Sequence, residues 1–341
     1  MQRRVMKLYK LVQNEVFKMV FKKRLLMVIG ILVVMISLFA YGQNRIIFQT
    51  KEKLIQRIGA TETADWKKLA GQQLIDLKNR LDNQYMDDNH KSSLKVRIEQ
   101  LQYNIANNIN HLDISSAKFT TRFMEQAIFL FLPLLVIMLS ADLVSGESSS
   151  GTIKLLVARC VPRWKILLSK FLCLTMMEIV VLFFALIISI AVSGIFFGFG
   201  GWMAPAATGF KVLAGQLDTS EVMNVPQWRY ALMVYSLAFY VSLVVGSISF
   251  MISVIVKTTA ASIGIIMSTL IAGSFLSHFL SDWKLTRYMY MVHLRLTDYM
   301  SGHFQPIEGM SMAFSVTVLG VWAVCALIIS FFYFTRRDIL V

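Results

Sequence analysis

The sequence contains few charged residues for its length. Only 16% of its 341 residues are Asp, Glu, Lys or Arg, whereas a soluble domain usually carries about a quarter. Several uninterrupted apolar runs reach about 18 residues, the length that crosses a bilayer. The low charge content therefore excludes an ordinary soluble protein and predicts an integral membrane protein.

Cysteine is also rare, and neither cysteine nor histidine forms a recognisable site. The cysteines Cys160, Cys173 and Cys325 match no metal or redox spacing, so we expect ordinary packing positions. The histidines all fall on the predicted outer side, which raises a metal or pH-sensor hypothesis. No two of them lie four residues apart with a carboxylate between, so scattered surface histidines are the better interpretation. They are His90, His111, His278, His293 and His303.

The chain lacks the short motifs of common enzymes. There is no G-x-x-x-x-G-K-[ST], no G-x-S-x-G and no H-E-x-x-H anywhere in the sequence. These absences predict a protein that is not itself an enzyme and that binds no metal or cofactor directly. If ATP drives this protein, a separate polypeptide must bind the nucleotide.

Six apolar runs predict six transmembrane helices. The first run is longer than the roughly 7 to 15 apolar residues of a signal peptide and has no A-x-A site after it. An anchor is therefore favoured over a cleaved signal. The predicted spans are Leu25–Tyr41, Ala127–Ser140, Phe171–Phe199, Tyr230–Val256, Thr258–Leu280 and Met312–Phe334.

The positive charge is distributed along the membrane boundaries. The net charge of +14 could suggest nucleic acid, but the basic residues flank apolar runs instead of lining one soluble face, and no nucleic-acid partner is predicted. Eight Lys or Arg precede the first span, four lie in the loop 145–165, and Arg336 and Arg337 end the chain. Since cytoplasmic segments carry excess Lys and Arg, we expect both termini and this loop in the cytoplasm and a multi-pass protein of the bacterial plasma membrane.

The segment 42–125 is expected outside the membrane as a helical hairpin. One predicted helix carries Leu74, Leu77 and Leu81, and Ser92 or Ser93 is placed to cap the second. The second helix has apolar residues at alternating steps of three and four, the spacing of a helix that packs on one partner. This series looks too long for its partner, which predicts contact with the equivalent element of a second subunit or with an extracellular accessory subunit. A simple spacer is the alternative. The series is Leu94, Ile98, Leu101, Ile105, Ile109 and Leu112.

Two polar or small-residue patterns lie within the spans. Glu178 shares a helix face with Thr175 and Ser189, and a charge at this depth usually faces protein or water. The face either couples movement or lines a path, or Glu178 is a structural, hydrogen-bonded residue. Small residues recur every four positions in the fifth span, which permits close helix packing, usually within one bundle. They are Ala260, Gly264, Ser268 and Ala272, and the fourth span has Ala238, Ser242 and Gly246.

The loop between the second and third spans reads "SGESSSGTIKLLVARCVPRWK". Its first residues are expected to break the second span's helix, and Ser150 or Thr152 to cap a new, short one over about 150–160. That helix ends before Pro162. A short cytoplasmic helix held between two spans would pass the motion of a docked partner to both spans.

The same stretch resembles the signature of type 2 ABC-transporter permeases, E-x-x-x-G-T-x-x-x-L-L-x-x-P-x-x-R-x-x-I-x-x-x-K. Cys160 stands where proline is common in that family. The N-terminal segment 1–24 is similar to the amphipathic connecting helix of these permeases, with its apolar positions on one face. The matching signature residues are Glu147, Gly151, Thr152, Leu156, Arg163, Ile166 and Lys170.

The resemblance implies an all-α membrane protein with six transmembrane helices. Residues 1–24 would form the interfacial connecting helix, 25–41 the first span, 42–125 the extracellular hairpin, and 126–341 the remaining five spans with the coupling helix at 150–160. Two permeases, identical or different, would pair within the membrane lipid, each docked on a separate ABC ATPase subunit that binds ATP and magnesium. The docking residues implied are Glu147, Gly151, Thr152, Ile153, Lys154, Leu156, Val157 and Arg163.

The relatives of such permeases include bacitracin- and lantibiotic-resistance systems. The expected function is thus ATP-driven export or extraction of a hydrophobic or amphipathic substrate, such as a peptide antibiotic, a lipid or a cell-envelope compound. One alternative is a non-transporting scaffold or sensor that receives envelope signals through the hairpin. Another is an ion-coupled transporter that uses Glu178, but no internal repeat supports it.

Overall fold

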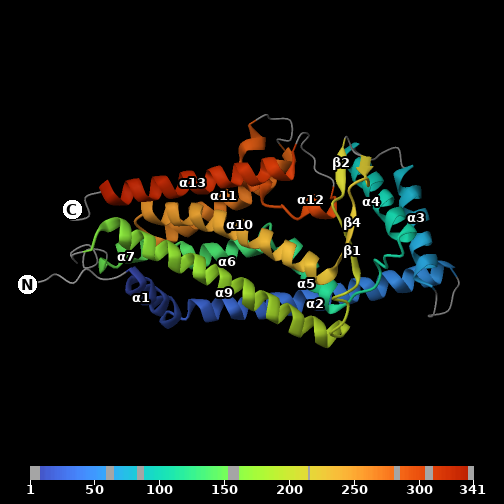
Figure 1. Cartoon of the computed structure of the whole chain (residues 1–341), viewed down its shortest axis with the longest axis horizontal. Helices are drawn as coiled ribbons and strands as arrows, with labels where there is room; N and C mark the ends of the chain where they lie inside the picture. Colours follow the sequence, from blue (N-terminus) through green and yellow to red (C-terminus); the bar gives the residue numbers. More distant parts are fainter. Residues whose placement is uncertain are drawn as a thin grey trace, which may run out of the picture.

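The computed structural model shows an elongated, mostly helical molecule. In Figure 1 the long helices run side by side along the molecule. Helices α1 (Leu8–Phe21) and α7 (Ser145–Ser149) lie at one end, and α3 (Trp66–Leu81) and α4 (Asp88–Ala106) at the other. The structure describes residues 8–58, 65–82, 88–152, 161–213, 216–279, 285–303 and 310–336.

Five helical segments within the described residues are long and apolar enough to cross a membrane. The described apolar stretch of α11 (Thr259–Phe279), from Thr259 to Gly273, is shorter. The prediction of a helical protein with several membrane spans is therefore confirmed, and length and composition support five of them. The five lie in α2 (Arg24–Ile58), in α6 (Phe131–Ser140) with α7, and in α9 (Arg163–Phe197), α10 (Gln227–Ile255) and α13 (Met312–Arg336).

The first long helix does not end at the predicted membrane boundary. Instead of stopping at Tyr41, α2 continues to Ile58 as one helix. Between these residues the sequence has no proline and a single glycine, Gly42, so nothing interrupts the backbone hydrogen bonds when the composition becomes polar. Before α2, Lys23 has a φ of 55°, which turns the chain sharply out of α1.

The region around the second predicted span, Ala127–Ser140, contains three short helices. A turn separates α5 (Ser116–Ala127) from α6, and another separates α6 from α7. The first break lies four residues before Pro133, whose ring excludes the helical carbonyl at that position. The sequence "SGESS" forms α7 itself, and the helical segment ends directly after it, at Ser150 and Gly151, within the stretch predicted to break the helix. Their polar side chains are compatible with one short turn of helix.

The predicted outer hairpin is present, with its seam closed by the chain itself. Leu77 of α3 packs against Ile98 and Leu101 of α4. Helix α4 begins at Asp88, so the predicted cap at Ser92 or Ser93 is wrong. The helix ends at Ala106, before Ile109 and Leu112, the last two residues of the predicted series. Among the described hairpin helices, Ile75 is the only exposed large apolar side chain, so the excess apolar surface that we expected is absent.

Four short strands depart from the all-α prediction. Strand β1 (Pro205–Thr208) pairs antiparallel with β4 (Met223–Pro226), and β2 (Lys211–Leu213) pairs with β3 (Gln216–Asp218). Strands of three or four residues are too short to give a recognisable alternating pattern. Gly209 joins the two ladders with a φ of +92°, and a Cβ there would lie 2.9 Å from the Glu221 carbonyl oxygen.

Two histidines are structural, contrary to the surface interpretation. His293 is the last residue of the 3-10 helix η2 (Tyr290–His293), which follows η1 (Thr286–Tyr288), and it is almost fully buried. Its Nδ1 lies 2.8 Å from Ser315 Oγ, and its Nε2 lies 2.8 Å from the Arg287 carbonyl oxygen. His111 is partly buried, with Nε2 2.8 Å from Gln73 Oε1. Both imidazoles thus connect neighbouring segments of the chain.

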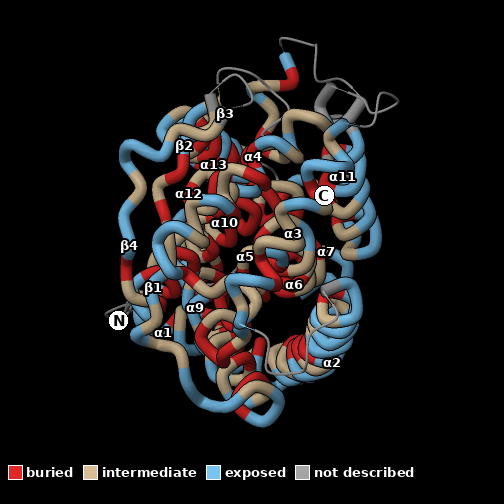
Figure 2. Tube along the Cα trace, turned by 90° about the vertical axis from the view of Figure 1, so that its right-hand side faces the viewer, coloured by how far each residue is buried: buried red, intermediate tan, exposed pale blue. Residues whose placement is uncertain are grey.

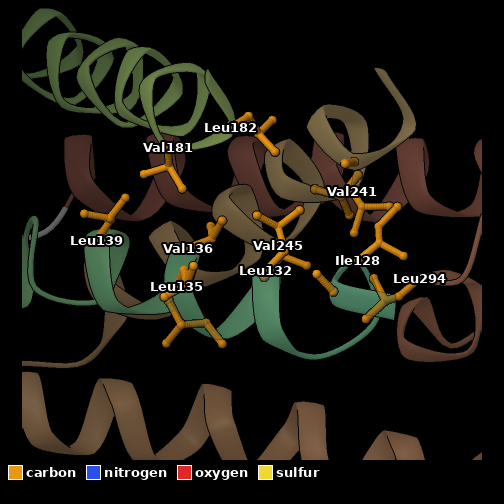
Figure 3. Packing of buried hydrophobic residues seen from close by; sticks show 14 of the residues in the cluster. Ile128, Leu132, Leu135, Val136, Leu139, Val181, Leu182, Val241, Val245 and Leu294 are labelled. Atoms are coloured by element: carbon orange, nitrogen blue, oxygen red, sulfur yellow. The ribbon is translucent and has the colours of Figure 1, made fainter. Parts of the chain in front are cut away.

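The main core lies between α6, α9 and α10. Buried residues gather along the middle of the bundle in Figure 2, and Figure 3 shows Val136 of α6 beside Val245 of α10. The small residues Ala238, Ser242 and Gly246 of α10 are buried, as their spacing predicts. Polar side chains also join these helices, because Ser253 Oγ accepts hydrogen bonds from the Val144 and Ser145 backbone N–H groups.

The small-residue face of α11 is different. Ala260, Gly264, Ser268 and Ala272 are all exposed on the chain. The opposite face, which includes Ile266 and Leu270, packs against the rest of the bundle. The prediction that this small face packs within one bundle is therefore wrong, and the face lies on the outside of the chain.

Candidate functional site

The candidate site is a cluster of four charges around the start of the loop 145–165. Its centre is Lys170 of α9, whose side chain is only 2% exposed. The Lys170 Nζ atom lies 2.9 Å from Glu15 Oε2, 2.8 Å from Glu147 Oε2 and 3.0 Å from the Leu143 carbonyl oxygen. A buried ammonium group is stable in a protein when its charge is paired and its protons have acceptors. Lys170 meets both conditions.

Lys18 completes the cluster. Its Nζ atom lies 2.8 Å from Glu15 Oε1 and 3.0 Å from Glu147 Oε1. Two lysines therefore face two glutamates, and each glutamate bridges both lysines. Burial alone would raise the pKa of Glu15, but Lys170 and Lys18 outweigh it and hold that pKa below its usual value. Burial opposes the charge of Lys18 too, yet the two carboxylates raise the pKa of Lys18.

The cluster joins three separate parts of the sequence. Glu15 belongs to α1, Glu147 to α7 and Lys170 to α9. On α1, Glu15 is buried together with Leu11 and Met19, one turn to either side, so a single helix face carries both the apolar and the ionic contacts with α9. The arrangement fixes the amphipathic helix against both helices that flank the loop.

A second ionic contact strengthens the same junction. Asp142, which is 5% exposed and lies between α6 and α7, pairs with Arg24 at the start of α2, and the Lys22 Nζ atom lies 3.8 Å away. A Cβ at Gly146 would lie 3.1 Å from Asp142 Oδ2, so this glycine leaves room for the carboxylate. The middle of α1 and the turn that follows it are thereby attached to the loop region.

The structure brings only some of the predicted docking residues together. Glu147 and the family-signature residue Lys170 meet in the cluster. Gly151 has a φ of +72°, a conformation that glycine adopts at little cost. The Thr152 hydroxyl donates to the Glu147 carbonyl oxygen at 3.4 Å, and the Ser150 hydroxyl donates to the Gly146 carbonyl oxygen at 2.8 Å. These hydroxyls close the preceding turn, and the short helix that they were predicted to cap lies mostly outside the described residues.

The remaining docking residues have different outcomes. Arg163 begins α9 and donates from Nη1 to the Thr335 carbonyl oxygen at 3.2 Å, so it connects α9 to the end of α13. The centre of the predicted coupling helix lies outside the described residues, together with one of the three cysteines. These positions are Ile153, Lys154, Leu156, Val157 and Cys160.

The predicted polar face of α9 points into the bundle. Glu178 and Ser189 are buried, and in the part of the chain that the structure describes neither side chain has a hydrogen-bond partner. Glu178 approaches α10 where Gly246 leaves space, since a Cβ there would lie 2.1 Å from Glu178 Oε1. Thr175 is partly buried, and its hydroxyl donates to the Phe171 carbonyl oxygen of its own helix.

Sequence reasoning missed the contribution of Glu15. Only the basic residues around it were used, as an indication of the cytoplasmic side. The available signal was its position, four residues from both Leu11 and Met19 and therefore on the apolar face of the helix. An acid on a buried face requires a partner, and Lys170 is that partner.

Comparisons with known proteins give a family but no activity. The chain is 26% identical over 343 residues to the uncharacterized protein YhcI of Bacillus subtilis (strain 168), and the match covers 96% of this chain and 98% of the relative. A family model described as a protein of unknown function (DUF2705) matches residues 96–340, which include α7, the loop and Lys170. The chain therefore belongs to the DUF2705 family.

Proposed function

We propose that this chain is the permease subunit of an ATP-binding cassette exporter. The observation that carries the proposal is the buried cluster of Glu15, Glu147 and Lys170. It attaches the amphipathic α1 and both sides of the loop to one another, so force applied to the loop reaches α6, α9 and α2 together. A subunit driven by a separate ATPase needs such a rigid connection between its docking loop and its spans.

The complex is expected to contain six spans per chain. Helix α11 begins near α7 and approaches η2, while α13 starts beside η2 and ends near Arg163. If α13 crosses the membrane, α11 connects the same two ends and crosses it too. This arrangement supports α11 as the sixth span, with α1, α7 and the end of α13 on the cytoplasmic side.

A second permease subunit would cover the exposed face of α11. Helices pack closely in membranes where small residues recur every four positions, and the face of Gly264, Ser268 and Ala272 is left open by the chain itself. Two copies that meet through α11 would enclose a path between them. The partner can be identical or a different permease.

The chemistry of ATP belongs to the partner in this proposal. The chain would bind no cofactor, and ATP with magnesium would sit on the ATPase subunit docked at Ile153, Leu156 and Val157. The hydrophobic or amphipathic substrate class comes from the resemblance to type 2 ABC-transporter permeases. A peptide antibiotic, a lipid or a cell-envelope compound fits this class.

Co-expression with the ATPase subunit tests the proposal. We expect Leu156→Asp to abolish co-purification of the ATPase, since a charge would enter the apolar docking contact, while membrane insertion stays normal. Ser149→Asp is the matched control, because it adds the same charge at an exposed residue of α7 and should leave assembly intact. Normal assembly and normal ATP turnover in the Leu156→Asp variant would contradict the proposal.

A further inference from the structure

A large cavity opens at the end of the molecule opposite the ionic cluster. We call it the outer cavity. Its volume is about 880 Å³, and it lies between α2, α4, α5 and the segment 295–303. A smaller cavity of about 220 Å³ adjoins it, because Gln100, Arg122, Glu125 and Ser301 line both. Pockets of roughly 300 to 1,000 Å³ commonly bind small molecules, so the outer cavity has room for a ligand.

Three arginines from different elements line the outer cavity. They are Arg97 of α4, Arg122 of α5 and Arg295. Among the described residues, none of them has a carboxylate within ion-pair distance. The guanidinium of Arg295 lies 4.0 Å from the centre of the Phe129 ring, which fixes its position at the wall. Three arginines of the described chain thus line one space, and Glu125 acts on Arg122 and Asp298 on Arg295 only from beyond ion-pair distance.

The acidic groups of the cavity neutralise this charge only in part. Glu125 accepts a hydrogen bond from the Tyr230 hydroxyl. Burial raises the pKa of Glu125 to about 7, against the lowering effects of Tyr230 and Arg122. Burial also raises the pKa of Asp298. Positive charge therefore dominates the cavity near neutral pH and increases as Glu125 becomes protonated.

The remaining lining supplies hydrogen bonds at the expected depth of lipid headgroups. Gln43 follows the end of the apolar part of α2, and Gln126 precedes the apolar helix α6. Ser93 and Ser301 add hydroxyl groups. Arginine side chains form paired, charge-assisted hydrogen bonds with phosphate oxygens, and amides and hydroxyls suit the glycerol or sugar groups that are joined to phosphates.

We propose that the outer cavity binds a phosphate-bearing polar group, with Arg97, Arg122 and Arg295 as its ligands. The phosphate can belong to the headgroup of an outer-leaflet lipid or to a soluble phosphate ester. Binding requires neither an ATPase nor a second permease, so this inference stands apart from the proposed function.

The test measures binding by the purified full-length chain. In the lipid arm, the chain is placed in nanodiscs of phosphatidylcholine with a minor fraction of phosphatidylglycerol, and native mass spectrometry counts the retained phosphatidylglycerol. In the soluble arm, calorimetry measures binding of glycerol phosphate to the chain in a neutral detergent. Retention of the lipid identifies a headgroup site, and binding of glycerol phosphate alone identifies a site for soluble esters.

The variants decide whether the arginines are responsible. We expect Arg122→Gln and Arg295→Gln each to weaken binding by about tenfold or more, the usual effect of losing a charge-assisted hydrogen bond. Arg97→Gln should also weaken it, and because Arg97 is exposed this variant keeps the test valid if the Arg122 variant misfolds. The control is Arg229→Gln, an exposed arginine at the start of α10 outside the cavity. Absence of binding in both arms, or equal binding by all variants, would overturn the proposal.

Discussion

Replacing Lys170 tests the ionic cluster most severely. In the Lys170→Met variant, Glu15 and Glu147 keep only Lys18 as a partner, so one negative charge remains uncompensated. The side chains of Glu15 and Glu147 are 6% and 10% exposed, and water cannot replace the lost ammonium group. Removing one partner of a buried ion pair costs about 3–5 kcal/mol. We expect this free energy to be lost mainly from the docking of α1 onto α9.

A native cysteine reports the opening of this contact. Cys173 lies one turn from Lys170, is fully buried, and is close enough for the charges of Glu15 and Lys18 to act on its thiol. With Cys160 and Cys325 replaced by serine, the rate of maleimide labelling at Cys173 follows the population of the open state. Since about 1.4 kcal/mol corresponds to a factor of ten, the Lys170→Met variant should label on the order of a hundredfold faster or more.

Two further variants separate the ionic effect from a loss of packing. Lys165→Met makes the same substitution on a neighbouring lysine outside the cluster and should label like the parent. The double variant Glu15→Gln with Lys170→Met leaves Glu147 paired with Lys18, so its labelling should return toward the parent rate. Slow labelling of Cys173 in Lys170→Met, equal to that of the parent, would refute the account of this cluster.

Three other predictions concern separate regions. In a chain without its native cysteines, Ser268→Cys should form a disulfide-linked dimer in membranes. Ile266→Cys, on the buried face of α11, should not form one. Equal cross-linking of the two variants would argue against pairing through α11. Burial lowers the pKa of His111 from 6.5 to about 4. Its contribution to stability is therefore present above about pH 6.5 and falls by about 2 kcal/mol between pH 7 and 5. An equal decrease of the melting temperature between these pH values in His111→Gln would contradict this. Gly246→Ala should destabilise the chain by roughly 1–3 kcal/mol, because the added methyl group overpacks against Glu178. Adding Glu178→Ala should restore part of the lost stability in thermal denaturation.

The sequence predicted the features that depend on long patterns. Apolar runs located the membrane helices, and regular leucine spacing located the α3–α4 seam. It could not predict where α2 ends, because no proline or glycine pattern marks the point where the helix changes from apolar to polar composition. The strands β1 to β4 were missed since three or four residues carry too little periodicity.

The candidate site depended on contacts between distant residues. The resemblance to type 2 ABC-transporter permeases included Glu147 and Lys170 but did not show that they meet. Glu15 was invisible as a site residue, because its role requires the docked position of α1, which is set by packing against α9. The small face of α11 illustrates the same limit, since spacing alone cannot tell whether the partner is the same chain or another.

The most direct measurement of the central claim is the composition and activity of the native complex. The chain is tagged at its C-terminus, purified from its own membrane in a mild detergent, and analysed for subunit stoichiometry and ATP hydrolysis. The account predicts that a polypeptide with a P-loop co-purifies in a fixed ratio and that the preparation hydrolyses ATP in the presence of magnesium. Purification of an intact chain without any nucleotide-binding subunit, and without ATP hydrolysis, would contradict it.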